Sequence, residues 1–75
     1  MRNWLHKLRK EKGLSQAELA ELVGTKRPVV SQWESGVRRP GYDNMVRLAD
    51  LLGPEVHARF AEEAANRHAQ DGQVA

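Results

Sequence analysis

Six neighbouring side chains in the middle of the chain have the chemistry needed to contact a nucleic acid. Cationic, amide, hydroxyl and small apolar groups can bind the base edges that line the major groove of duplex DNA. If this stretch is helical, the side chains lie on the outer face of the helix and on the turn before it. The alternative is the solvated face of a short surface helix. The six residues are Lys26, Arg27, Pro28, Val29, Ser31 and Gln32.

The expected contacts differ from one residue to the next. Arg27 could bind guanine through two hydrogen bonds, Gln32 could pair with adenine or reach a phosphate, and Val29 could touch a thymine methyl group. Pro28 has no backbone N–H and must therefore lie in the first turn of the helix. It also disfavours helical geometry at the residue before it. The helix is therefore expected to begin at Arg27 or at Pro28.

Two predicted helices with a short turn between them position these side chains. The first covers residues 15–23, because Ser15 is a good N-cap and Glu18 follows at the spacing of a capping box. Gly24 can take the left-handed conformation that ends a helix. The second helix is expected over residues 27–35. So few residues separate the two helices that they must cross steeply, which predicts a helix-turn-helix.

The start of the second helix departs from the usual pattern. Lys26 cannot act as an N-cap, so Thr25 is expected to take that role. The apolar residues Pro28, Val30 and Trp33 are then expected to face inward.

Three further helices complete the predicted fold. They cover about residues 3–12, 42–52 and 54–69. Residues 70–75 have nothing to pack against and are expected to fray. The fold class is therefore all-α, with one compact domain over residues 1–69 that forms a bundle of four or five helices. The large side chains expected in its core are Trp4, Trp33, Tyr42 and Phe60.

The composition is that of one small helical domain with an uneven charge. The chain has 75 residues, no cysteine and a formal net charge of +2. Residues 1–53 carry ten Lys and Arg against six Asp and Glu, and residues 54–75 carry two against four. A basic N-terminal part favours a polyanionic partner. No apolar run approaches the roughly 18 residues that a membrane span requires, so no membrane partner is expected.

The order of the motifs resembles that of a known family. LSQAELAELVG is followed by KRPVVSQWESG, then by RRP and by a helix that ends in LADLLG. Over about residues 5–53, this order is similar to the lambda-repressor/Cro-like helix-turn-helix regulators of bacteria and phages. The resemblance implies dimeric binding to a palindromic operator, transcriptional control and a cytoplasmic location. The chain departs from the family at Lys26, where Ser or Thr is frequent, and at Pro28, where a polar base-reading residue is frequent.

Further residues gain an expected role from the resemblance or from their surroundings. The resemblance implies that Gln16 contacts a DNA phosphate, and that Arg9 and Glu34 form an ion pair between the first helix and the end of the third. Flexible cations in a loop beside the DNA-reading helix suit phosphate contact. The alternative for each is an ordinary surface polar group. The phosphate candidates are Gln16, Thr25, Arg38 and Arg39, with Lys7 and Lys10 as weaker ones.

The last predicted helix carries an apolar stripe with two possible roles. Val56, Phe60 and Ala64 recur at a spacing of four residues and share one face. They could complete the core of the monomer, or they could pair with the same stripe in a second copy. A dimer is attractive because two units on one face of DNA, about 34 Å apart, read more bases than one unit.

Two classes of function remain open, and a third is not expected. The first is a sequence-specific DNA-binding regulator: a phage-type repressor, a restriction-modification controller or an antitoxin. The second is a protein-interaction module that binds a toxin or another protein through the last helix, with DNA binding secondary. An enzyme is not expected, because no nucleophile with its base is evident. No cofactor or metal is expected either, because no cysteine is present and the histidines lack ligand spacing. These histidines are His6, His57 and His68.

Overall fold

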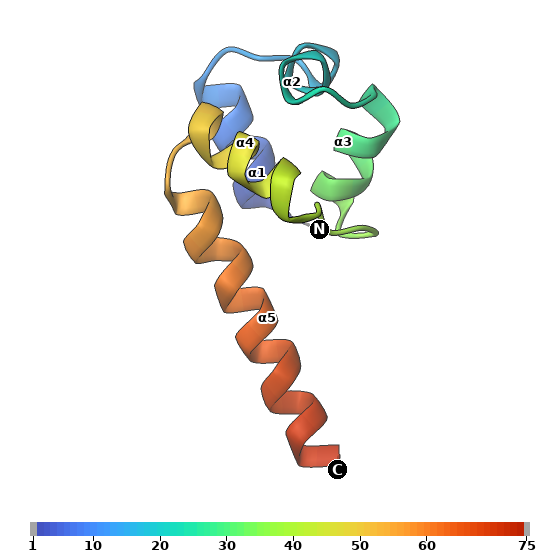
Figure 1. Cartoon of the computed structure of the whole chain (residues 1–75), viewed down its shortest axis with the longest axis vertical. Coiled ribbons are helices and arrows are strands. Elements are labelled where there is room, and N and C mark those ends of the chain that lie inside the picture. Colours follow the sequence, from blue (N-terminus) through green and yellow to red (C-terminus); the bar gives the residue numbers. More distant parts are fainter. Residues whose placement is uncertain (1, 75) are drawn as a thin grey trace.

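Five α-helices make up the described part of the chain, as expected for an all-α bundle. The computed structural model describes the backbone of residues 2–74 and the side chains of residues 2–66. The helices are α1 (Asn3–Glu11), α2 (Gln16–Val23), α3 (Arg27–Ser35), α4 (Tyr42–Leu52) and α5 (Glu55–Val74). Figure 1 shows α1 to α4 gathered into one body, from which α5 projects as a single long helix. The molecule measures 41 × 22 × 21 Å along its principal axes.

Local signals set the bounds of α2, which is the first helix of the helix-turn-helix. The Ser15 hydroxyl accepts a hydrogen bond from the backbone N–H of Glu18 at 3.0 Å, and the Glu18 carboxylate accepts one from the Ser15 N–H at 2.9 Å. This reciprocal pair is the capping box expected from the sequence. Gly24 ends the helix with φ of 90°, a conformation that costs glycine least.

The start of α3 differs from expectation. The N-cap position belongs to Lys26, and no side chain caps the helix, so the capping role expected of Thr25 is wrong. Arg27 is the first helical residue and Pro28 the second. Pro28 loses no hydrogen bond there, because N–H groups in the first turn have no intrahelical partner. Its ring is exposed rather than directed inward, so only Val30 and Trp33 of the expected apolar set are buried.

The core lies between the helix-turn-helix and the helices that support it. Its ten buried side chains are Leu5, Leu19, Ala20, Val23, Val30, Trp33, Leu48, Leu52, Val56 and Phe60. Trp4 is half-buried and packs its ring edge-to-face against Phe60, with ring centroids 5.0 Å apart. Tyr42 was expected in this core, but it is 78% exposed. It is the first residue of α4, and the buried face of that helix begins one turn later, at Met45.

Helix α5 is longer than expected, and its apolar stripe divides between two surroundings. Val56 and Phe60 are fully buried in the monomer core, so they cannot form the face of a dimer. Ala64, one turn further, is exposed. The backbone continues as helix to Val74, five residues past the expected end at residue 69. The side chains of residues 67–75 lie outside the described part of the chain, so the fraying expected of residues 70–75 stays a prediction.

Candidate nucleic-acid interface

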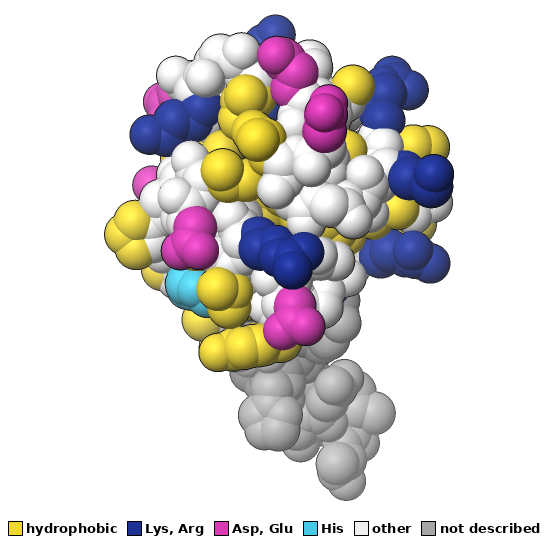
Figure 2. All heavy atoms as spheres, turned by 45° about the horizontal axis from the view of Figure 1, so that its top comes forward, with side chains coloured by type: hydrophobic (Ala, Val, Ile, Leu, Met, Phe, Trp, Pro, Cys, Tyr) yellow, Lys and Arg dark blue, Asp and Glu magenta, His cyan; other side chains and the backbone are white. Residues whose placement is uncertain are grey.

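The start of α3 presents the exposed chemistry expected of a DNA-reading helix. Lys26, Arg27 and Pro28 are exposed, whereas Ser31 and Gln32 are half-buried. Val29 is also half-buried, and it packs against the core. Figure 2 shows Lys and Arg side chains gathered along the edge of the molecule on the side where Figure 1 places α3. The most accessible of the six expected residues are therefore the ones at the N-terminal end of α3.

An open cleft of about 590 Å³ lies beside this end of α3. The N-terminus of α2 lines it through Ser15 and Gln16, and Arg27 and Lys10 contribute from the two neighbouring helices. The N-terminal turn of a helix offers free N–H groups and a partial positive charge, both of which favour an anion. Arg9 and Glu18 also line the cleft, so three cations, one carboxylate and a helix N-terminus meet on one surface.

A buried ion pair lies behind this surface and joins α1 to α3, as the resemblance implied. Arg9 Nε lies 2.6 Å from Glu34 Oε2, and Arg9 Nη2 lies 3.2 Å from Glu34 Oε1. Arg9 also donates to the backbone carbonyl of Leu14 at 2.7 Å, just before α2. Gln16 Nε2 donates to Glu34 Oε1 at 3.1 Å. One carboxylate therefore fixes α1, the start of α2 and the end of α3 relative to one another.

The two arginines of the loop after α3 have different surroundings. Arg38 is exposed, as a phosphate-binding side chain would be. The Arg39 guanidinium lies 5.6 Å from the centroid of the Phe60 ring, and its Nη2 donates to the Phe60 carbonyl at 3.3 Å. Arg39 therefore stabilises the contact between the loop and α5, and the phosphate contact expected of it is not supported by its position.

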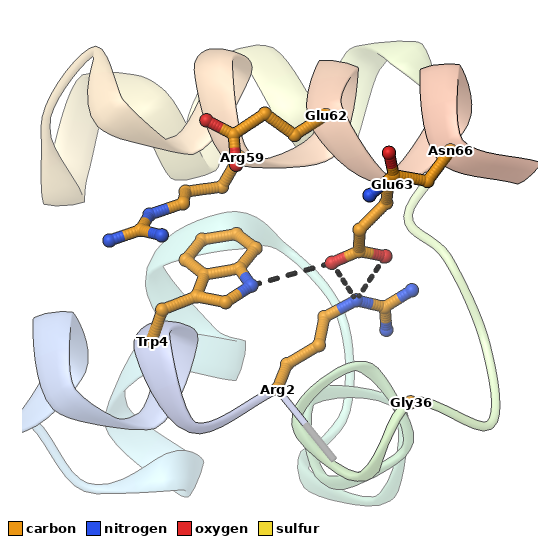
Figure 3. A pocket seen from close by; sticks show the side chains of 7 residues that line it. All are labelled: Arg2, Trp4, Gly36, Arg59, Glu62, Glu63 and Asn66. Carbon is orange, nitrogen blue, oxygen red and sulfur yellow. Dashed lines mark hydrogen bonds and ion pairs between the residues drawn. The ribbon is translucent and has the colours of Figure 1, made fainter.

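Two further arginines, for which the sequence analysis predicted no role, donate hydrogen bonds to backbone carbonyls at the ends of helices. Arg2 is buried, donates to the carbonyls of Trp33 and Arg38, and pairs with Glu63 of α5, as Figure 3 shows for the last contact. Arg47 of α4 donates to the carbonyl of Val23 at the end of α2, at 2.9 Å. Both cations sit where a helix has free carbonyls and a partial negative charge. No local pattern marks them, because each reaches a distant part of the chain.

Comparison with known proteins identifies the family. The sequence model of a family described as helix-turn-helix matches residues 5–55, which is more than half of the chain. The chain belongs to this helix-turn-helix family. The matched residues run from α1 to the first residue of α5, so they include the cleft beside α3 and the Arg9–Glu34 ion pair.

Two curated relatives share this helix-turn-helix. An uncharacterised HTH-type transcriptional regulator, YqaE, from Bacillus subtilis (strain 168) is 30% identical over 67 residues, which are 89% of this chain and 58% of the relative. A putative HTH-type transcriptional regulatory protein from Aeropyrum pernix is 38% identical over 52 residues, which are 69% of this chain and 16% of the relative. The chain thus spans about half of the first relative and a sixth of the second. No solved structure matches.

No cluster that could hold a metal ion occurs among the residues whose side chains are described. Within residues 2–66, no three His, Cys, Asp or Glu side chains come together for that purpose. His6 lies against the buried ion pair, with Nδ1 3.3 Å from Glu34 Oε1. The side chain of His68 lies outside the described residues. No helix of the described chain is long and apolar enough to cross a bilayer.

Three of the described carboxylates have lowered pKa values, and two of them, Glu34 and Glu63, are shielded from solvent. For Glu34, burial is the largest influence and raises the pKa, but hydrogen bonds from three neighbours and the charge of Arg9 together outweigh it. For Glu63, burial again raises the pKa, and the hydrogen bond and charge of Arg2 are the main influences that lower it by more. Both groups therefore favour the ionised form in the folded state.

We expect the free energy of unfolding to decrease as the pH falls below about 4.3, the ordinary pKa of a free glutamate. A carboxylate whose pKa is lower in the folded than in the unfolded state stabilises the fold at pH values above its unfolded-state pKa. This contribution is lost as the pH falls through the folded-state pKa. Urea unfolding at a series of pH values from neutral to about 3 measures this loss. Glu63→Gln should show a shallower loss than the wild type. A free energy that stays constant over this range would contradict the expectation.

Proposed function

We propose that this chain is a DNA-binding transcriptional regulator that inserts α3 into the major groove of duplex DNA. The observation that carries the proposal is the exposed cationic start of α3 beside the cleft at the N-terminus of α2. Family membership supports the same function, and so do the names of the two relatives, both of which are called HTH-type transcriptional regulators. A helix on a rigid body fits the major groove, where base edges present distinct donor and acceptor patterns.

Within this proposal, the side chains divide into base-reading and phosphate-binding groups. Arg27 reads a base because its guanidinium is exposed at the first residue of α3. The other base-reading residues are Lys26, Pro28, Val29, Ser31 and Gln32. Phosphate contacts come from Gln16, Thr25 and Arg38, and they set affinity without selecting sequence. Gln16 is held for this role by its hydrogen bond to Glu34.

Duplex selection from a random pool, followed by gel shifts at several salt concentrations, tests the proposal. Arg27→Ala is expected to weaken binding by about 1–3 kcal/mol and to relax the preference for one base. Arg59→Ala is the matched control, because Arg59 is also exposed but pairs with Glu55 on the surface of α5. The control should retain wild-type affinity. Recovery of no preferred duplex, or equal binding by the wild type and Arg27→Ala, would contradict the proposal.

We further propose that two copies bind a palindromic operator and repress transcription by occupying it. One copy offers only a short reading surface, and two copies related by a twofold axis double it. The contact between the two copies comes from the exposed part of α5 that projects from the body, and it includes Ala61, Ala64 and Ala65. Val56 and Phe60 are not part of it, because they are buried within the monomer.

Sedimentation of the chain alone and on the selected duplex measures the stoichiometry. Two copies per duplex are expected, together with a selected sequence that is palindromic. Ala64→Glu should reduce the dimer, because it places like charges face to face on the two copies of α5, while Leu22→Glu on the exposed face of α2 should leave self-association unchanged. A single copy on an asymmetric site would exclude this part of the proposal.

A protein-interaction module is the second candidate, and one observation favours it. Figure 1 shows the C-terminal part of α5 projecting away from the body formed by α1 to α4, and its described side chains beyond Glu63 are exposed: Ala64, Ala65 and Asn66. A toxin or other protein could bind there. Titration of this chain with duplex DNA separates the candidates: the regulator predicts shifts in the amide signals of α3, and the interaction module predicts none.

A further inference from the structure

The C-terminal end of α3 is closed by a residue from the start of the chain. The last carbonyls of a helix have no partner within the helix. The backbone N–H of Arg2 donates to the Glu34 carbonyl at 2.6 Å, and Arg2 Nη1 donates to the Trp33 carbonyl at 2.6 Å. Arg2 therefore satisfies two free carbonyls and places a positive charge at the negative end of the helix dipole.

The same guanidinium holds the loop that follows α3. Arg2 Nη1 also donates to the Arg38 carbonyl at 2.8 Å, and the Arg38 N–H donates to the Gln32 carbonyl at 3.2 Å. The Arg38 side chain is exposed. The backbone from which this candidate phosphate-binding side chain extends is therefore fixed by Arg2 on one side and by α3 on the other.

Arg2 is in turn held by α5. Its Nε lies 3.0 Å from both carboxylate oxygens of Glu63, and its guanidinium carbon lies 5.0 Å from the centroid of the Phe60 ring. Figure 3 shows that Arg2, which directly precedes α1, and Trp4, which lies in α1, both contact Glu63. Arg2 is only 6% exposed, whereas the Glu63 side chain is 32% exposed, so solvent reaches the ion pair from the α5 side alone.

We propose that Arg2 is a positioning residue of the DNA-binding surface. It fixes the position of the C-terminal end of α3 and of the Arg38 backbone. Its ion pair with Glu63 connects both of them to α5. This inference rests on the proposed function. It has one consequence that the exposed residues of α3 do not imply: a change at Glu63, on a helix that does not enter the groove, alters DNA affinity.

The test compares Arg2→Met, Arg2→Lys and a destabilised control on the selected duplex, at a temperature where circular dichroism shows each variant folded. Arg2→Met is expected to bind about 10-fold more weakly and to lower the slope of log affinity against log salt by about one, because Arg38 no longer reaches its phosphate. Arg2→Lys should recover only part of the loss, since one ammonium cannot bridge Glu63 and two carbonyls. Leu51→Ala, a core change in α4, should leave the affinity and the slope unchanged.

Each outcome decides a separate question. If folded Arg2→Met binds with wild-type affinity and slope, the positioning role is excluded and the proposed function stands. If the wild type binds no duplex, the proposed function fails. The capping role is then tested by the amide signals of residues 33–39, which should shift in Arg2→Met and not in Leu51→Ala.

If Arg2→Met does not fold, Glu63→Gln replaces it, with binding expected to weaken by about 3-fold or more. Unchanged affinity in that variant would overturn the inference.

Discussion

Glu34→Ala is expected to remove about 3–5 kcal/mol of folding stability, because it leaves a buried arginine without its counter-charge. Glu34 is 3% exposed and Arg9 is 5% exposed. The carboxylate accepts hydrogen bonds from Arg9 and Gln16 and lies near His6, and these contacts come from two other segments of the chain. A domain of this size rarely has more than about 3–5 kcal/mol of stability in total. The variant should therefore be largely unfolded in water.

Urea unfolding followed by circular dichroism measures the effect. Glu11→Ala is the matched control, because Glu11 lies exposed at the end of α1 and should change stability little. The double change Arg9→Met with Glu34→Leu should recover much of the loss, since an apolar pair of similar volume avoids burying a charge. If Glu34→Ala were as stable as Glu11→Ala, the ion pair would not be holding α1 against α3.

Phe60→Ala is expected to cost about 3–5 kcal/mol, the usual range for removing a buried aromatic ring. The ring is fully buried and contacts Trp4 edge-to-face. The guanidinium groups of Arg2 and Arg39 also lie over it, at 5.0 and 5.6 Å from its centroid. Loss of the ring therefore removes both the apolar contact and the cation–π contacts that hold α5 on the body.

Phe60→Leu separates these two contributions. It keeps most of the buried apolar volume but removes the π face, so it should lose clearly less stability than Phe60→Ala. Ala61→Gly is a suitable control for the helix itself, because its position on α5 is exposed and the change costs about 1 kcal/mol through helix propensity alone. A similar loss from Phe60→Ala and Ala61→Gly would show that α5 is not anchored by Phe60.

Local sequence signals were sufficient to predict the helix-turn-helix. The capping box at Ser15 and Glu18 and the stop at Gly24 act within one helical turn, so their effect can be predicted without knowing what packs nearby. Helix α3 was predicted to end at Ser35 and to begin at Arg27 or Pro28, and the structure has it from Arg27 to Ser35. The Arg9–Glu34 ion pair could be anticipated only from the resemblance, because 25 residues separate its members.

Which side chains are buried could be learned only from the folded molecule. Periodicity placed Tyr42 on an apolar face, but Tyr42 is exposed at the first residue of α4, whereas Met45 packs against the core. It placed Val56 and Phe60 on one stripe but could not say whether the monomer or a second copy buries them. The contacts of Arg2 and Arg39 could not be predicted from sequence either, because both side chains bind residues of α5 that are far away along the chain. Local signals fix the helices because they act over a few residues, whereas burial depends on segments that meet only after the chain has folded.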